Sequence, residues 1–106
     1  ARGTCRRLSG MVSWAWKAGV IGRTRQMAGP YAADGVPANC IEAGRIEPPL
    51  SSQSSPEVLR HAVAAIPAKR LGTPDEIAAV ARFLASEGAG YVTGVCVDVN
   101  GGVFMG

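Results

Sequence analysis

The 106-residue sequence predicts a single domain of the α/β class, with about three helices and two strands. Apolar residues recur at helical spacing in three segments, and two short apolar runs bounded by Gly, Pro or Asn are typical of strands. An apolar fraction of 47% and a charged fraction of 18% fit a globular interior. A chain of this size should bury roughly 65% of its unfolded surface, which suffices for one small domain.

The first predicted helix covers residues 11–28, in which the apolar positions follow a helical period. Gly29-Pro30 should stop or kink it, because proline has no N–H to donate and its ring clashes with the preceding turn. Residues 1–10 are basic and show no periodic pattern, so we interpret them as an arm.

A short strand is expected at residues 36–41, where Pro37 limits pairing at one end. The following residues 47–56 are rich in Pro and Ser, which indicates a flexible loop. Ser55-Pro56 then predicts the start of a second helix, with Ser as the cap and Pro at the first helical position.

The sequence Thr73-Pro74-Asp75-Glu76 repeats this start signal for a third helix, because acidic residues favour the positive helix end. Residues 95–99 are predicted to form a strand that is buried on both faces.

Composition excludes several classes of protein. The net charge of +3 is modest, and no basic stripe interleaved with aromatics suggests nucleic-acid binding. No apolar run reaches the roughly 18 residues of a membrane span and no signal peptide is recognisable, so a cytoplasmic location is expected. The three cysteines, Cys5, Cys40 and Cys96, form no C-x-x-C pair, and neither a metal site nor a disulfide framework is predicted.

The last third of the chain carries a series of recognisable motifs. It contains Arg70-Leu71-Gly72-Thr73-Pro74-Asp75-Glu76-Ile77-Ala78, Gly90-Tyr91-Val92-Thr93-Gly94 and Val97-Asp98-Val99-Asn100-Gly101-Gly102. These motifs resemble the carboxy-terminal part of short-chain dehydrogenase/reductases, particularly the acetoacetyl-CoA and 3-oxoacyl reductase branch. The resemblance implies a truncated Rossmann-like remnant with the last two parallel strands. It also implies a parent activity of NAD(P)-dependent carbonyl reduction.

The helix of this family carries Tyr-x-x-x-Lys, and Lys17 with the residues after it resembles the Lys end of that motif. The resemblance implies a catalytic and cofactor-binding role for Lys17. Ser13 occupies the position of the Tyr, so the proton donor of the family is replaced.

Residues 39–48 resemble the family's Asn-x-x-x-Pro-Gly followed by Ile-x-Thr, which contacts the nicotinamide. Gly44 and Ile46 keep this pattern and by resemblance would bind the cofactor, whereas Ala43 replaces the Pro and Pro48 replaces the Thr. The sequence contains no G-x-x-x-G-x-G for the pyrophosphate. We therefore expect an incomplete redox site, and no bound cofactor in the isolated chain, NAD(P) being the cofactor of the family.

Three alternatives stay open. Ser13 and Lys17 lie four residues apart on the predicted helix and could act as nucleophile and base of a small esterase. Glu42 and Glu47 could act as the two carboxylates of a glycosidase. The chain could also be a subunit that a separate amino-terminal half completes.

Self-association is expected from the same resemblance, because a two-stranded remnant exposes a strand edge that can pair with another chain. Members of the family form dimers and tetramers through the helix equivalent to residues 11–28 and through the last strand. Trp14 and Trp16 lie on that helix and are predicted interface anchors, so a homo-oligomer is expected.

Overall fold

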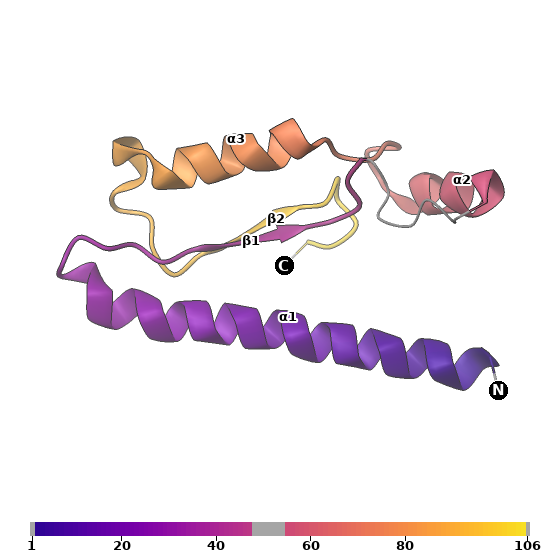
Figure 1. Ribbon diagram of the computed structural model, residues 1–106, viewed down its shortest axis with the longest axis horizontal. Coiled ribbons are helices and arrows are strands. Elements are labelled where there is room, and N and C mark those ends of the chain that lie inside the picture. The colour runs from indigo at the N-terminus through magenta and orange to yellow at the C-terminus, as the bar shows by residue number, and fades with distance from the viewer. Residues whose placement is uncertain (1, 48–54, 106) are drawn as a thin grey trace. The chain divides into compact units, whose positions relative to one another are not determined.

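A computed structural model describes residues 2–47 and 55–105, with side chains from residue 15 onward (Figure 1). The helices are α1 (Arg2–Ala32), α2 (Pro56–Ala65) and α3 (Pro74–Ala85), followed by the short 3₁₀ helix η1 (Glu87–Ala89). The strands are β1 (Cys40–Ala43) and β2 (Cys96–Val99), and they form one two-stranded sheet. The predicted α/β class with three helices and two strands is confirmed.

The two strands are parallel. The amide of Cys40 donates to the carbonyl of Val95 at 3.0 Å, and the amide of Gly44 donates to that of Val99 at 2.8 Å. Donor and acceptor numbers rise together, as they do only between parallel strands, so Cys40 lies opposite Cys96.

The chain divides into two compact units, each assembled from two separate stretches. The first combines Ala1–Cys40 with Gly90–Cys96, and the second combines Ile41–Ala89 with Val97–Gly106. That the chain acts as a single domain stays a prediction.

Helix α1 corrects two expectations. It begins at Arg2, so residues 2–10 are helical and the predicted arm is wrong. This stretch contains the good helix formers Arg and Leu but also two glycines, a Thr and a Ser, so residue propensity does not explain the helix there. The helix also continues through Pro30 to Ala32, because a proline so close to the end disturbs only the last turn.

Strand β1 begins later than the predicted 36–41. Val36 still belongs to the turn after α1, since its amide donates to the Tyr31 carbonyl at 3.2 Å. Most of the predicted flexible loop at 47–56 falls on residues 48–54, which lie outside the described residues.

The predicted starts of α2 and α3 are confirmed by their caps. The Ser55 hydroxyl accepts from the Val58 amide at 3.3 Å. At α3 the Thr73 hydroxyl accepts from the Glu76 amide at 3.2 Å, and the Glu76 carboxylate accepts from the Thr73 amide at 3.1 Å. Both caps satisfy amides that the first helical turn leaves without partners.

The core is small. Among the described side chains only Ala28, Ile66 and Ala89 are buried, and β2 is half-buried rather than buried on both faces as predicted. None of the helices in the described part of the chain combines the length and the apolar character that a membrane crossing requires.

Candidate functional site

The segment that leaves the carboxyl end of β1 contains the predicted nicotinamide-contacting residues, and backbone bonds hold it on two sides. On one side the Gly44 amide donates to Val99. On the other side Ile46 forms a parallel bridge with Gly72, and the Gly72 amide donates to the Arg45 carbonyl at 2.9 Å. The segment is therefore fixed against the end of β2 and against the loop before α3.

Close packing requires glycine at two positions of this arrangement. A Cβ on Gly44 would lie 2.8 Å from the Asn100 Cα, a distance that atoms in proteins do not tolerate. Gly101, which follows β2, has a φ of +65°, and its Cβ would lie 2.8 Å from Ile66 Cγ2. Backbone segments can approach this closely only where a side chain is missing.

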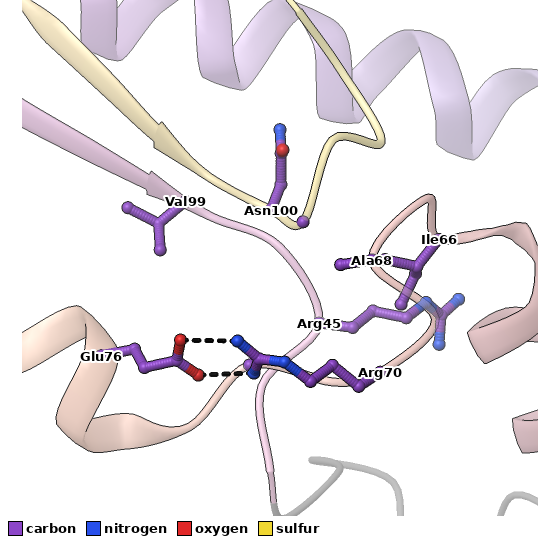
Figure 2. Close-up of a pocket in the computed structure, with 9 residues that line it drawn as sticks. Arg45, Ile66, Ala68, Arg70, Glu76, Val99 and Asn100 are labelled. Carbon is purple, nitrogen blue, oxygen red and sulfur yellow. Dashed lines mark hydrogen bonds and ion pairs between the residues drawn. The ribbon is translucent and has the colours of Figure 1, made fainter.

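A small open pocket of about 130 Å³ lies beside the segment, entirely within the second unit (Figure 2). Its apolar wall includes Ile66 and Val99. None of its lining residues carries a thiol, an imidazole or a hydroxyl, and its one carboxylate, Glu76, is paired with Arg70. The lining residues are Arg45, Ile66, Ala68, Arg70, Gly72, Glu76, Val99, Asn100 and Gly101.

A bidentate ion pair lies in the lining of the pocket. Figure 2 shows the Arg70 guanidinium fork facing the Glu76 carboxylate, with Nη1 to Oε1 at 2.7 Å and Nη2 to Oε2 at 2.9 Å. Arg70 Nη1 also donates to the Leu71 carbonyl at 3.1 Å. Because the same Glu76 closes the capping box of α3, the pair attaches the loop before α3 to the start of that helix.

This pairing changes the acidity of the carboxyl group. Hydrogen bonds from Arg70, and after them the bond from the Thr73 amide, lower the pKa of Glu76 to about 2. The pKa of Arg70 is raised, first by the hydrogen bond and charge of Glu76 and last by the charge of Glu47. Glu76 is therefore ionised at any physiological pH.

The pair predicts a defined pH dependence of stability. The pKa of Glu76 is lower in the folded chain than its ordinary value of 4.5, so its contribution is complete above pH 4.5 and disappears as the pH falls toward 2. Denaturant titrations between pH 6 and pH 2 should show a smaller loss of unfolding free energy for Glu76→Gln than for the unsubstituted chain. Glu87→Gln, which removes a carboxylate elsewhere in the second unit, should follow the unsubstituted chain. Parallel curves for all three proteins would contradict the pairing.

The structure places the sequence-predicted residues as follows. Gly44 and Ile46 come together at the end of β1, as described. Glu42 lies half-buried within β1 and Glu47 lies exposed beyond it. Lys17 belongs to the first unit, where it is exposed on α1.

Ser13 also lies on α1, and its side chain is outside the described residues. Nothing in the described contacts tests the Ser13–Lys17 or Glu42–Glu47 pairing, and the catalytic and cofactor-binding roles remain predictions.

Sequence reasoning missed the pair between Arg70 and Glu76 and the packing of Gly101 on Ile66. One signal was present, because the Thr-x-x-Glu of a capping box follows Arg70 within six residues. The meeting of Gly101 with Ile66 has no such local signal.

Comparisons with known proteins show which family the sequence matches. A family model described as enoyl-(acyl carrier protein) reductase matches residues 9–104. The 3-oxoacyl-[acyl-carrier-protein] reductase FabG of Vibrio cholerae is 45% identical over 89 residues, which are 84% of this chain and 36% of the relative. MabA of Mycobacterium tuberculosis, a reductase of the same description, is 42% identical over 90 residues, 85% of this chain and 36% of its own.

An acetoacetyl-CoA reductase of Allochromatium vinosum is 41% identical over 89 residues, again 84% of this chain and 36% of the relative. The parallel strands and capped helices form a small α/β chain, and the relatives it matches are described as reductases. It belongs to the short-chain dehydrogenase/reductase family, and it spans about a third of the length of the curated relatives it matches.

Proposed function

We propose that this chain supplies the nicotinamide-side part of an NAD(P)-dependent reductase of 3-oxoacyl thioesters or similar carbonyls, and that it holds no complete redox site alone. One observation carries the proposal: Gly44 and Ile46 lie in a fixed segment at the carboxyl end of a parallel strand. In open α/β sheets, ligands bind outside the carboxyl ends of the strands. The names of the relatives, FabG and acetoacetyl-CoA reductase, support the class of substrate.

The rest of the redox site has to come from residues outside this sequence. Binding of the pyrophosphate requires a glycine-rich turn at a helix start, and the 106 residues contain no G-x-x-x-G-x-G. Ser13 replaces the family's Tyr. We propose that a longer polypeptide or a separate amino-terminal half provides the missing elements, with Lys17 holding the cofactor ribose.

Cofactor binding tests the first part of this proposal. Calorimetric titration of the 106-residue chain with NADH and NADPH should show no binding in the micromolar range, because the pyrophosphate has no glycine-rich turn to bind. A low-micromolar dissociation constant would contradict the proposal.

Restoring the missing parts of the redox site tests the second part of the proposal, that other residues complete this site. A fusion with the amino-terminal part of a FabG-type reductase, carrying Ser13→Tyr, should reduce acetoacetyl-CoA. The same fusion with Ser13 retained should be about 10²–10⁴-fold slower, because it lacks the proton donor. Adding Lys17→Ala to the fusion that carries Ser13→Tyr should abolish the rate increase that Ser13→Tyr provides. Adding Lys69→Ala instead should leave that increase unchanged, because Lys69 Nζ donates to the Ala64 carbonyl and has no proposed role at the cofactor. Equal rates with Ser13 and Tyr would contradict the assignment.

We further propose that the chain is a homo-oligomer located in the cytoplasm, with neither nucleic acid nor membrane as a partner. Exposed aromatic surface on α1, above all Trp16, supports the association. The comparisons give no support to an esterase or a glycosidase. The substitutions Ser13→Ala and Glu42→Gln should accordingly leave any background hydrolysis of aryl esters and aryl glycosides unchanged.

A further inference from the structure

Two cysteines lie opposite each other at the start of the two strands. Cys40 is the first residue of β1 and Cys96 the first residue of β2, and both belong to the first unit. The Cys40 amide donates to the Val95 carbonyl. In a parallel ladder, a residue whose amide donates to the carbonyl of residue j on the neighbouring strand lies opposite residue j+1 of that neighbouring strand. Because the acceptor is Val95, Cys40 lies opposite Cys96. The two side chains therefore leave the same face of the sheet next to each other.

Neighbouring bonds fix this register. The Asn39 carboxamide accepts from the Val95 amide at 3.1 Å and donates from Nδ2 to the Val92 carbonyl at 2.9 Å. The Gly94 amide donates to the Ala38 carbonyl at 2.8 Å. A slip of one residue would break all of these bonds, so the two cysteines are held opposite each other.

The spacing of the strands decides what the thiols can do. Neighbouring strands lie about 4.8 Å apart, and the Cβ atoms of opposite residues on parallel strands share that spacing. Disulfides prefer Cβ atoms about 3.8 Å apart, so a disulfide here would have to draw the strands together. Metal–sulfur bonds of about 2.3 Å, the value for zinc, allow two sulfurs on one ion to lie up to about 4.6 Å apart, so both side chains can reach a shared ion without the strands drawing together. Both side chains are half-buried and thus accessible to an ion.

We propose that Cys40 and Cys96 form a two-thiolate site for a single soft metal ion, of which Cu(I) is the representative. Thiolates select soft ions such as Cu(I). Within the described residues no group of three or more His, Cys, Asp or Glu side chains could hold a metal, which disfavours the four-ligand geometry of structural zinc. Binding replaces the two thiol protons, so two protons leave for each Cu(I) bound. The site does not depend on the reductase proposal.

The test uses the full 106-residue chain with Cys5→Ser, which removes the third thiol. The reduced protein is titrated without oxygen against Cu(I) held by bicinchoninate. It should withdraw one Cu(I) per chain, and adding Cys40→Ser or Cys96→Ser should each weaken binding by about 100-fold or more. Loss of a residue that only supports a metal ligand lowers metal affinity by about 10–100-fold, and loss of the ligand itself should lower it at least as much.

Copper X-ray absorption on the Cys5→Ser protein measures the site without further substitution, so it decides the question even if a serine variant fails to fold. It should show two sulfur neighbours at one distance, in a species that sediments with the same mass with and without copper. The proposal is overturned by unchanged affinity in a folded serine variant, by a single sulfur neighbour, or by copper that joins two chains.

Discussion

Replacing Gly101 by alanine should lower the free energy of unfolding of the chain by about 2–5 kcal/mol. A residue other than glycine in the left-handed region costs about 1–2 kcal/mol, and overpacking a filled site costs about 1–3 kcal/mol. Gly101 incurs both, because its φ is +65° and its Cβ would lie 2.8 Å from Ile66 Cγ2, one of the few buried side chains. Urea titration followed by circular dichroism measures the change.

Two further glycines separate the two causes. Gly35 has a φ of +75° with no atom within 4 Å, so Gly35→Ala should cost only the backbone contribution, about 1–2 kcal/mol. Gly88 has neither problem, since its Cβ would lie 3.7 Å from the Ser86 hydroxyl, and Gly88→Ala should change stability by less than about 0.5 kcal/mol. If Gly101→Ala lowers the free energy of unfolding no more than Gly35→Ala does, the result contradicts the close approach of residue 101 to Ile66.

Self-association should depend on Trp16, whose side chain is 74% exposed on α1. Burying such an indole contributes about 3 kcal/mol for each copy before the entropy of association is counted. The unsubstituted chain should sediment as a dimer or larger species at tens of micromolar, and Trp16→Lys should shift it toward monomer.

Tyr91→Lys is the matched control, because Tyr91 is fully exposed on the loop before β2 rather than on α1. It should leave the sedimentation profile unchanged. Trp14 is kept in all variants, since its side chain lies outside the described residues. A folded monomer for the unsubstituted chain would contradict the prediction.

The sequence predicted those elements whose signals are local. The starts of α2 and α3 depend on hydrogen bonds between residues three positions apart, and the caps at Ser55 and Thr73 follow directly from residue type. The start of α1 was missed because residues 2–10 show no apolar period and contain two glycines, and both features argue against a helix.

Features that depend on distant partners were not predictable in the same way. Strand β1 starts at Cys40 because its ladder begins with Val95, and no local pattern in residues 36–41 shows which of them pairs with that distant residue. The pairing of Cys40 with Cys96 follows from that register, so the sequence, in which the two cysteines form no motif, predicted no metal site. Gly44 and Ile46 were found through family resemblance alone, and the packing that requires glycine at position 44 became visible only against Asn100.

The distance along the chain between the paired strands also affects how the protein is made. The ladder joins Cys40 to Val95, so β1 leaves the ribosome long before its partner exists. At 5–20 residues per second, the intervening stretch takes about 3–11 s to synthesise. The caps of helices α2 and α3 need only residues three positions apart, so these helices can start during that interval, whereas closing the sheet must wait. Newly made β1 therefore spends seconds with the edge that β2 later covers open to pairing with other chains.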